Sequence, residues 1–137
     1  MIVGTEWLVE ATGCDKAALR DEEVIRAVFT RAIADLGLQA VGSFWHKFDG
    51  EGGVTGLVAL TESHLACHTY PEHGTATFNL YCCRNRPVWD WEGYLKEYLG
   101  AGVVIVTRFE RGNRRKRYPN PTSRIQNLRS KIVGGEA

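Results

Sequence analysis

The strongest structural signal in this chain lies in residues 54–82, which read VTGLVALTESHLACHTYPEHGTATFNLYC. Residues 54–61 are apolar almost throughout, which is typical of a strand in the interior of a sheet. Two further strands are predicted at 64–70 and 75–82, separated by the turn-forming residues Pro71 and Gly74. Adjacent strands joined by such short turns favour antiparallel pairing.

The flanking sequence adds strands and helices to this antiparallel core. Apolar residues recur at three- and four-residue steps between Asp15, a suitable N-cap, and Gly37, a suitable C-cap. The predicted elements are a strand at 5–12, a helix at 16–36, strands at 38–48, 54–61, 64–70 and 75–82, a helix at 88–99 and a strand at 103–106. This order, β-α-β-β-β-β-α-β, predicts an α+β two-layer sandwich, with a mostly antiparallel sheet and the helices on one face. A homodimer would cover the other face.

The size and composition limit the classes of protein to which this chain can belong. The chain has 137 residues, of which 44% are hydrophobic and 24% charged, as in an ordinary globular domain rather than a disordered or collagen-like chain. No apolar run approaches the roughly 20 residues that span a bilayer, and no basic and apolar signal segment opens the sequence. We therefore expect a cytoplasmic protein whose four cysteines are free thiols.

The charge is distributed unevenly along the chain. Residues 1–107 carry a net charge of −6 and residues 108–137 a net charge of +7. We expect a single domain at 1–110 and a basic, loosely ordered tail at 111–137. A basic tail can bind nucleic acid, but only Tyr118 is available for stacking on bases, so we expect this tail to lie against an acidic protein surface.

Reactive side chains concentrate at 61–74, where three of the four histidines lie. On a strand His64 and His68 share one face but lie about 13 Å apart, at ~3.3 Å per residue, so they bind one metal only if the strand bends. A zinc site that includes His73 is therefore a weak alternative, and we expect no metal. A hydrolase that uses Ser63 as nucleophile lacks the G-x-S-x-G elbow. On periodicity alone, a polar strand end with incidental histidines is an equal alternative.

The same segment resembles the signature of the prokaryotic S-adenosylmethionine decarboxylases, pyruvoyl enzymes of polyamine biosynthesis. The similarity is carried by ESHL at 62–65, HTYPE at 68–72, Gly74 and Cys83. It extends to LVE at 8–10, CD at 14–15, HKF at 46–48, GVTG at 53–56 and FERG at 109–112, so that matches spread over about residues 4–112.

The resemblance implies a precursor that cleaves itself between Glu62 and Ser63. Ser63 Oγ attacks the Glu62 carbonyl carbon, the amide becomes an ester, and loss of the Ser63 α-proton releases Glu62 and leads to a pyruvoyl group. By resemblance, His68 is the processing base and Thr55, where the family usually has serine, assists it. Cys83 matches the residue that donates a proton to the substrate. The pyruvoyl group derived from Ser63 is the cofactor, an electron sink for decarboxylation.

The resemblance also implies a homodimer and a small-molecule substrate, S-adenosylmethionine. The candidate substrate-binding residues are Phe48, Trp7, Glu10 and Glu72. Two positions depart from the family pattern, Asn79 in place of aspartate and Arg84 in place of glycine. A pyruvoyl-dependent arginine or ornithine decarboxylase of the same family is therefore an alternative, and a non-catalytic regulatory paralogue is a second one. Cys82 points to the opposite face of a strand from Cys83 and is expected to be structural.

Overall fold

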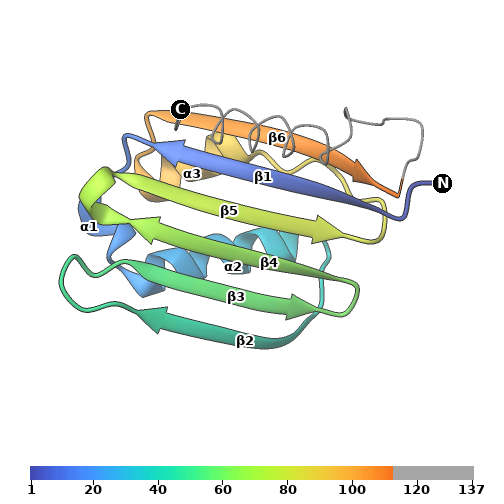
Figure 1. The fold of residues 1–137 in the computed structure, drawn as a ribbon, viewed down its shortest axis with the longest axis horizontal. Helices are drawn as coiled ribbons and strands as arrows, with labels where there is room; N and C mark the ends of the chain where they lie inside the picture. Colours follow the sequence, from blue (N-terminus) through green and yellow to red (C-terminus); the bar gives the residue numbers. More distant parts are fainter. Residues whose placement is uncertain (113–137) are drawn as a thin grey trace, which may run out of the picture.

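The computed structural model describes residues 1–112, so almost all of the tail predicted at 111–137 lies outside the described residues. Six strands form one sheet in the order β2-β3-β4-β5-β1-β6, and every neighbouring pair is antiparallel (Figure 1). The elements are β1 (Gly4–Thr12), α1 (Lys16–Leu19), α2 (Glu22–Asp35), β2 (Ala40–Lys47), β3 (Val54–Leu60), β4 (Ser63–Tyr70), β5 (Thr75–Cys82), α3 (Trp91–Leu99) and β6 (Val103–Arg111), with a 3-10 turn at Pro71–His73.

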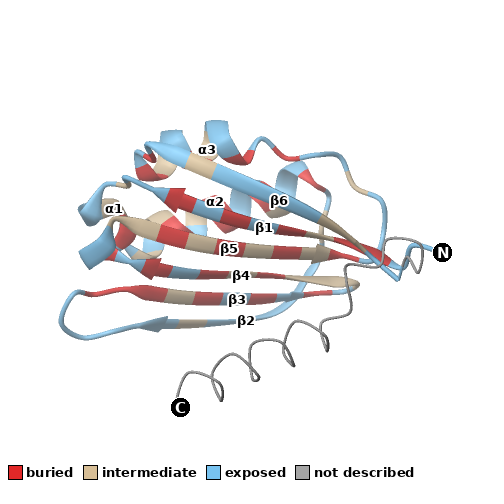
Figure 2. Ribbon diagram, turned by 45° about the horizontal axis from the view of Figure 1, so that its top comes forward, coloured by how far each residue is buried: buried red, intermediate tan, exposed pale blue. Residues whose placement is uncertain are grey.

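All three helices lie on one face of the sheet, and no helix among residues 1–112 covers the other (Figures 1 and 2). The strands show this asymmetry as a period-two burial pattern. In β5 the side chains of Ala76, Phe78, Leu80 and Cys82 are buried and alternate with half-buried residues. The predicted α+β sandwich is thereby confirmed. No helix among these residues is long and apolar enough to cross a membrane.

Aromatic side chains join the sheet to the helices. The Phe29 ring of α2 lies 4.9 Å from the Trp45 ring of β2 and 6.3 Å from the Phe78 ring of β5. Phe78 in turn lies 5.7 Å from Trp91, the first residue of α3. Because these rings are bulky and mostly buried, they hold α2 and α3 at fixed positions beneath the sheet.

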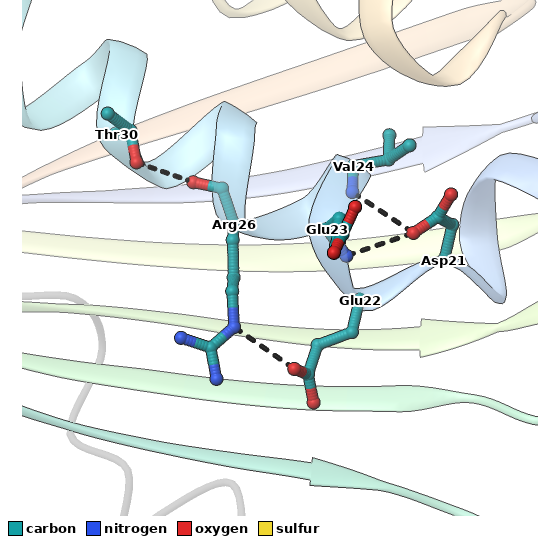
Figure 3. A network of polar contacts seen from close by, with 6 residues as sticks. All are labelled: Asp21, Glu22, Glu23, Val24, Arg26 and Thr30. Atoms are coloured by element: carbon teal, nitrogen blue, oxygen red, sulfur yellow. Dashed lines mark hydrogen bonds and ion pairs between the residues drawn. The ribbon is translucent and has the colours of Figure 1, made fainter.

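The single helix predicted at 16–36 is wrong in one respect, since the structure divides it into α1 and α2. The Asp21 carboxylate accepts hydrogen bonds from the backbone N–H groups of Glu23, at 3.0 Å, and Val24, at 3.4 Å (Figure 3). Asp21 is therefore the N-cap of a new helix, and Glu22 and Glu23 add the negative charge that a helix N-terminus favours.

The remaining boundaries differ from prediction mainly at α3 and β6. Asp90 caps α3 by accepting from the Gly93 N–H, so the helix begins at Trp91 rather than at 88. The last strand runs to Arg111 rather than ending at 106, because it pairs with β1 along its whole length. This pairing places the first strand of the chain between the last two strands, β5 and β6.

Candidate active site

We use the name open face for the helix-free side of the sheet. It carries Glu6, Leu8 and Glu10 of β1, Thr55 and Leu57 of β3, His64, Ala66 and His68 of β4, and Thr77, Asn79 and Tyr81 of β5. The strand register places side chains in rows across this face. One row runs from Thr55 through His68 and Thr77 to Glu10.

A hollow of about 400 Å³ lies where the open face meets the turn between β2 and β3. Its lining includes four of the predicted site residues, Phe48, Thr55, His68 and Glu72, together with Tyr70 and the glycine-rich turn. We call this hollow the histidine pocket. Thr55 Oγ1 lies 3.0 Å from His68 Nδ1, a hydrogen bond that orients the imidazole. The Phe48 ring is 53% exposed and packs edge-on against the His46 ring.

The Glu62–Ser63 peptide bond lies at the opposite end of β4, in the tight turn that follows Leu60 of β3. The Glu62 carbonyl oxygen accepts a hydrogen bond of 3.2 Å from the Cys83 backbone N–H. Such a donor polarises the carbonyl and makes its carbon more electrophilic. We call this group, Glu62 and Ser63 with Cys82 and Cys83, the serine turn.

The two adjacent cysteines contact the serine turn in different ways. Cys82 is buried and lies directly opposite Ser63 in the β4–β5 ladder. Burial raises the pKa of the Cys82 thiol, while the nearby Ser63 side chain acts in the opposite direction. Cys83 is exposed. Their different burial agrees with the opposite faces that strand alternation predicts.

Arg84 forms an ion pair with the Glu62 carboxylate. Both side chains are partly exposed, so the pair contributes little to the stability of the fold. Its consequence is local, because it places a cation beside the peptide bond that follows Glu62.

Within one chain the structure does not bring the histidine pocket to the serine turn. His68 follows Ser63 by five residues on β4, about 17 Å along the strand at ~3.3 Å per residue. The two side chains also point to opposite faces of the sheet, since Ser63 alternates with His64 and shares its face with the buried Leu65. His68 and Thr55 therefore cannot act on Ser63 of the same chain without a large rearrangement.

The other two substrate-binding candidates lie outside the pocket. Trp7 is 5% exposed and belongs to the core on the helix side of the sheet, so the structure does not bring it to Phe48. Glu10 is exposed on the open face, one strand beyond Thr77 in the row that contains His68.

A chain of polar contacts crosses the open face and was not predicted. His64 Nε2 lies 2.7 Å from Asn79 Oδ1, and the Asn79 amide donates to the Glu6 carboxylate at 2.8 Å. Arg111 donates to the other Glu6 oxygen at 2.6 Å. The hydrogen bond from Asn79, followed by the contact with Arg111, lowers the pKa of the Glu6 carboxyl, although partial burial opposes this shift. The alternation of side chains along each strand can be read from the sequence. That β6 lies beside β1, and so brings Arg111 to Glu6, follows only from the strand order of the structure.

No three histidine, cysteine, aspartate or glutamate side chains come together as metal ligands among residues 1–112. His64 is instead bound to Asn79, and His73 lies near Glu72, at 4.0 Å. The weak zinc alternative therefore has no support from the geometry of the three histidines.

The fold and sequence are similar to those of known proteins. The model of one protein family, described as S-adenosylmethionine decarboxylase, matches residues 5–112. The chain is 35% identical over 111 residues to the S-adenosylmethionine decarboxylase proenzyme of Clostridium tetani, covering 80% of this chain and 87% of that one. It is 36% identical over 111 residues to the S-adenosylmethionine decarboxylase proenzyme of Moorella thermoacetica, covering 80% and 88%. The crystal structure of the adenosylmethionine decarboxylase from Aquifex aeolicus matches with a TM-score of 0.71 and 27% identity, covering 87% of this chain and 98% of that one.

Proposed function

The chain belongs to the S-adenosylmethionine decarboxylase family, and from that premise we propose that it is a self-cleaving, pyruvoyl-dependent S-adenosylmethionine decarboxylase of polyamine biosynthesis. It is a carboxy-lyase made as an inactive precursor. The observation that supports self-cleavage at this position is the hydrogen bond from the Cys83 N–H to the Glu62 carbonyl oxygen, because it puts a donor on the peptide bond that the proposed reaction breaks.

The residues of the serine turn suit the cleavage chemistry. Ser63 Oγ attacks the Glu62 carbonyl carbon, and the Cys83 N–H stabilises the negative charge that develops on the carbonyl oxygen. The C–N bond then breaks and leaves an ester between Ser63 and Glu62. A base removes the Ser63 α-proton, Glu62 departs as a carboxylate, and the dehydroalanine that remains takes up water and loses ammonia to give the pyruvoyl group. Ser63 is only half-buried and follows the exposed Thr61, so water can reach it.

The base comes from a second copy of the chain. His68, oriented by Thr55, is the histidine suited to the task, yet it lies at the far end of β4 from Ser63. A two-fold axis near Ala66, at the middle of β4, would turn the His68 end of one copy onto the Ser63 end of the other. Because the Ser63 side chain points to the helix side, the incoming imidazole would meet the backbone of Ser63, where the α-proton is removed, rather than its Oγ. The open face supports this homodimer, since Phe44, Leu57 and Ile105 are exposed there at 63%, 45% and 56%.

The substrate binds in the histidine pocket of one copy, onto which the proposed two-fold axis brings the serine turn of the other copy, with its pyruvoyl group and Cys83. Phe48 offers an exposed aromatic face to the adenine ring or to the sulfonium cation, and Glu72 adds a carboxylate. The pyruvoyl group supplies the electron sink that carbon dioxide loss requires. Cys83 then gives its thiol proton to the substrate α-carbon, a task for which its exposed position is suited.

Intact-mass spectrometry of the denatured protein tests this proposal. We expect two fragments, 1–62 and 63–137, and a mass increase of the second after borohydride reduction of its keto group. The Ser63→Ala chain is the control and stays at 15.3 kDa. An uncut wild-type chain would contradict the proposal and favour the regulatory paralogue. Release of carbon dioxide from arginine or ornithine, but not from S-adenosylmethionine, would overturn the substrate assignment alone.

A further inference from the structure

Two consecutive residues contact Glu62 in the serine turn. The Cys83 backbone N–H donates to the Glu62 carbonyl oxygen at 3.2 Å, and the Arg84 guanidinium is ion-paired with the Glu62 carboxylate. Among residues 1–112 neither Glu62 nor Arg84 takes part in another ion pair. Arg84 is therefore the counter-ion of the residue whose carbonyl group is attacked in the proposed cleavage.

The proposed cleavage adds negative charge to Glu62, which already carries a charged side chain. When Ser63 Oγ attacks the Glu62 carbonyl carbon, an O–C bond forms and the carbonyl oxygen becomes an oxyanion. The C–N bond then breaks, and the Oγ proton passes to the Ser63 nitrogen, which becomes a free amine. In the later elimination the base takes the Ser63 α-proton, the bond from Cβ to the ester oxygen breaks, and Glu62 departs with that electron pair. Without a counter-ion, the charge of Glu62 would change from −1 to −2 at both points.

The Arg84 guanidinium lowers the electrostatic cost of this second charge. Arginine stays protonated in proteins and binds carboxylates through its N–H groups. With Arg84 in place, the charge of the pair changes from 0 to −1, so the repulsion between the two negative groups of Glu62 is partly cancelled. Both side chains are partly exposed, and solvent therefore screens the effect and keeps it modest.

We propose that Arg84 is a positioning residue for self-cleavage, which holds the Glu62 side chain and neutralises it while the adjoining carbonyl group takes up negative charge. The inference rests on the proposed function, because it concerns the peptide bond that the precursor is proposed to cut. Arg84 stands where the family pattern has glycine, so this counter-ion is a feature of this chain rather than of the motif.

The rate of self-cleavage after pulse-labelled cell-free synthesis tests this role, since the precursor is followed from the moment it is made. We expect Arg84→Gln to slow cleavage about fivefold, the upper end of what an exposed ion pair contributes. Arg84→Lys keeps a cation and should retain most of the rate. Arg86→Gln is the matched control, because Arg86 lies in the same loop but reaches toward Gly37, 3.8 Å from where a Cβ atom would stand there.

A double-mutant cycle and a salt series separate the charge of Arg84 from a structural role in the loop. Arg84→Gln should have no further effect in a Glu62→Gln chain, since no carboxylate is left to neutralise. The fivefold difference should also shrink in about 1 M salt, where charges are screened beyond roughly 3 Å. A slowing that persists in the Glu62→Gln chain or at high salt would overturn the proposal.

The same rates distinguish this inference from the proposed function. A parent chain that is never cut would overturn both of them. A parent chain that is cut, but no faster than Arg84→Gln, would overturn the role of Arg84 alone and leave the proposed function standing.

Discussion

At the scale of single residues, the proposed function gives Cys83 two separable tasks. Its backbone N–H faces the Glu62 carbonyl and is assigned to self-cleavage, whereas its side chain is assigned to decarboxylation. Cys82, although adjacent, is buried and lies opposite Ser63 in the β4–β5 ladder. Substitutions that remove the side chain and the N–H separately can therefore assign each task.

We predict that Cys83→Ala cleaves at the wild-type rate but loses most of its turnover, because alanine keeps the N–H and removes the thiol. Cys83→Pro removes the N–H as well, and we expect cleavage to slow by about 100-fold, the usual effect of losing one oxyanion donor. Time-resolved gel analysis of the purified precursors measures cleavage, with Asn85→Pro as the control for a proline in the same loop. Equal cleavage of Cys83→Ala and Cys83→Pro would contradict the role of the N–H.

The candidate site residues follow from a sequence motif, but their grouping does not. The motif around Ser63 and His68 indicates which side chains carry the chemistry. The division into a histidine pocket and a serine turn depends on the length of β4, and becomes visible only when the register is known.

At the scale of elements, the contacts of Glu6 join three strands through polar groups. Asn79 belongs to β5 and Arg111 to β6, and both donate to the Glu6 carboxylate of β1. The pKa of this carboxyl is lowered in the folded state, so its stabilising effect is present above the unfolded value of about 4.5 and is lost as the pH falls through the folded pKa.

We therefore predict that Glu6→Gln lowers the free energy of unfolding by about 1 kcal/mol at neutral pH. The difference from the parent chain should shrink below about pH 4.5 and vanish in stronger acid. Urea denaturation at several pH values, in the uncleaved Ser63→Ala background, measures it. Glu97→Gln on the exposed face of α3 is the control. A difference that does not depend on pH would contradict this assignment.

The start of α2 depends on Asp21, whose carboxylate satisfies two backbone N–H groups (Figure 3). We predict that Asp21→Ala costs about 1 kcal/mol of unfolding free energy, and that Asp21→Asn costs less, because asparagine also caps helices. Thermal or urea denaturation of the three chains gives the comparison. Equal stability of Asp21→Ala and the parent would show that α2 starts without this cap.

The break before α2 also shows why element boundaries were less predictable than element types. Apolar periodicity continues across residues 16–36, so it predicts one helix. The capping preference of Asp21, with two acidic residues after it, was present in the sequence, but it competes with a periodic pattern that covers more residues. No capping signal competes with the periodicity of residues 75–82, and the predicted bounds of this strand agree with β5.

At the scale of the whole molecule, the proposed function takes the histidine pocket from one chain and the serine turn from another. We predict that Ser63→Ala and His68→Ala, each inactive alone, complement each other when co-expressed. In the mixed dimer the intact His68 of the Ser63→Ala chain faces the intact Ser63 of the His68→Ala chain. Intact-mass spectrometry should then show cleavage of the His68→Ala chain only, in about half of the dimers or fewer, as random pairing dictates.

A mixture that stays uncut would contradict the shared site, provided that the two proteins form dimers. Sedimentation of each purified variant supplies that control. The homodimer stays a prediction from the uncovered sheet face, and no pattern within a single strand indicates that the partner would also supply a base.

The position of β1 between β5 and β6 has a consequence for the cleaved protein. The fragment 1–62 contains β1, β2 and β3, and the fragment 63–137 contains β4, β5 and β6. Three of the five strand ladders, β3–β4, β5–β1 and β1–β6, join one fragment to the other. The strands of the two fragments are therefore interleaved in one sheet, and neither fragment can form this sheet alone. The sheet must therefore form before the chain is cleaved. After cleavage, the two fragments can separate only if the sheet unfolds.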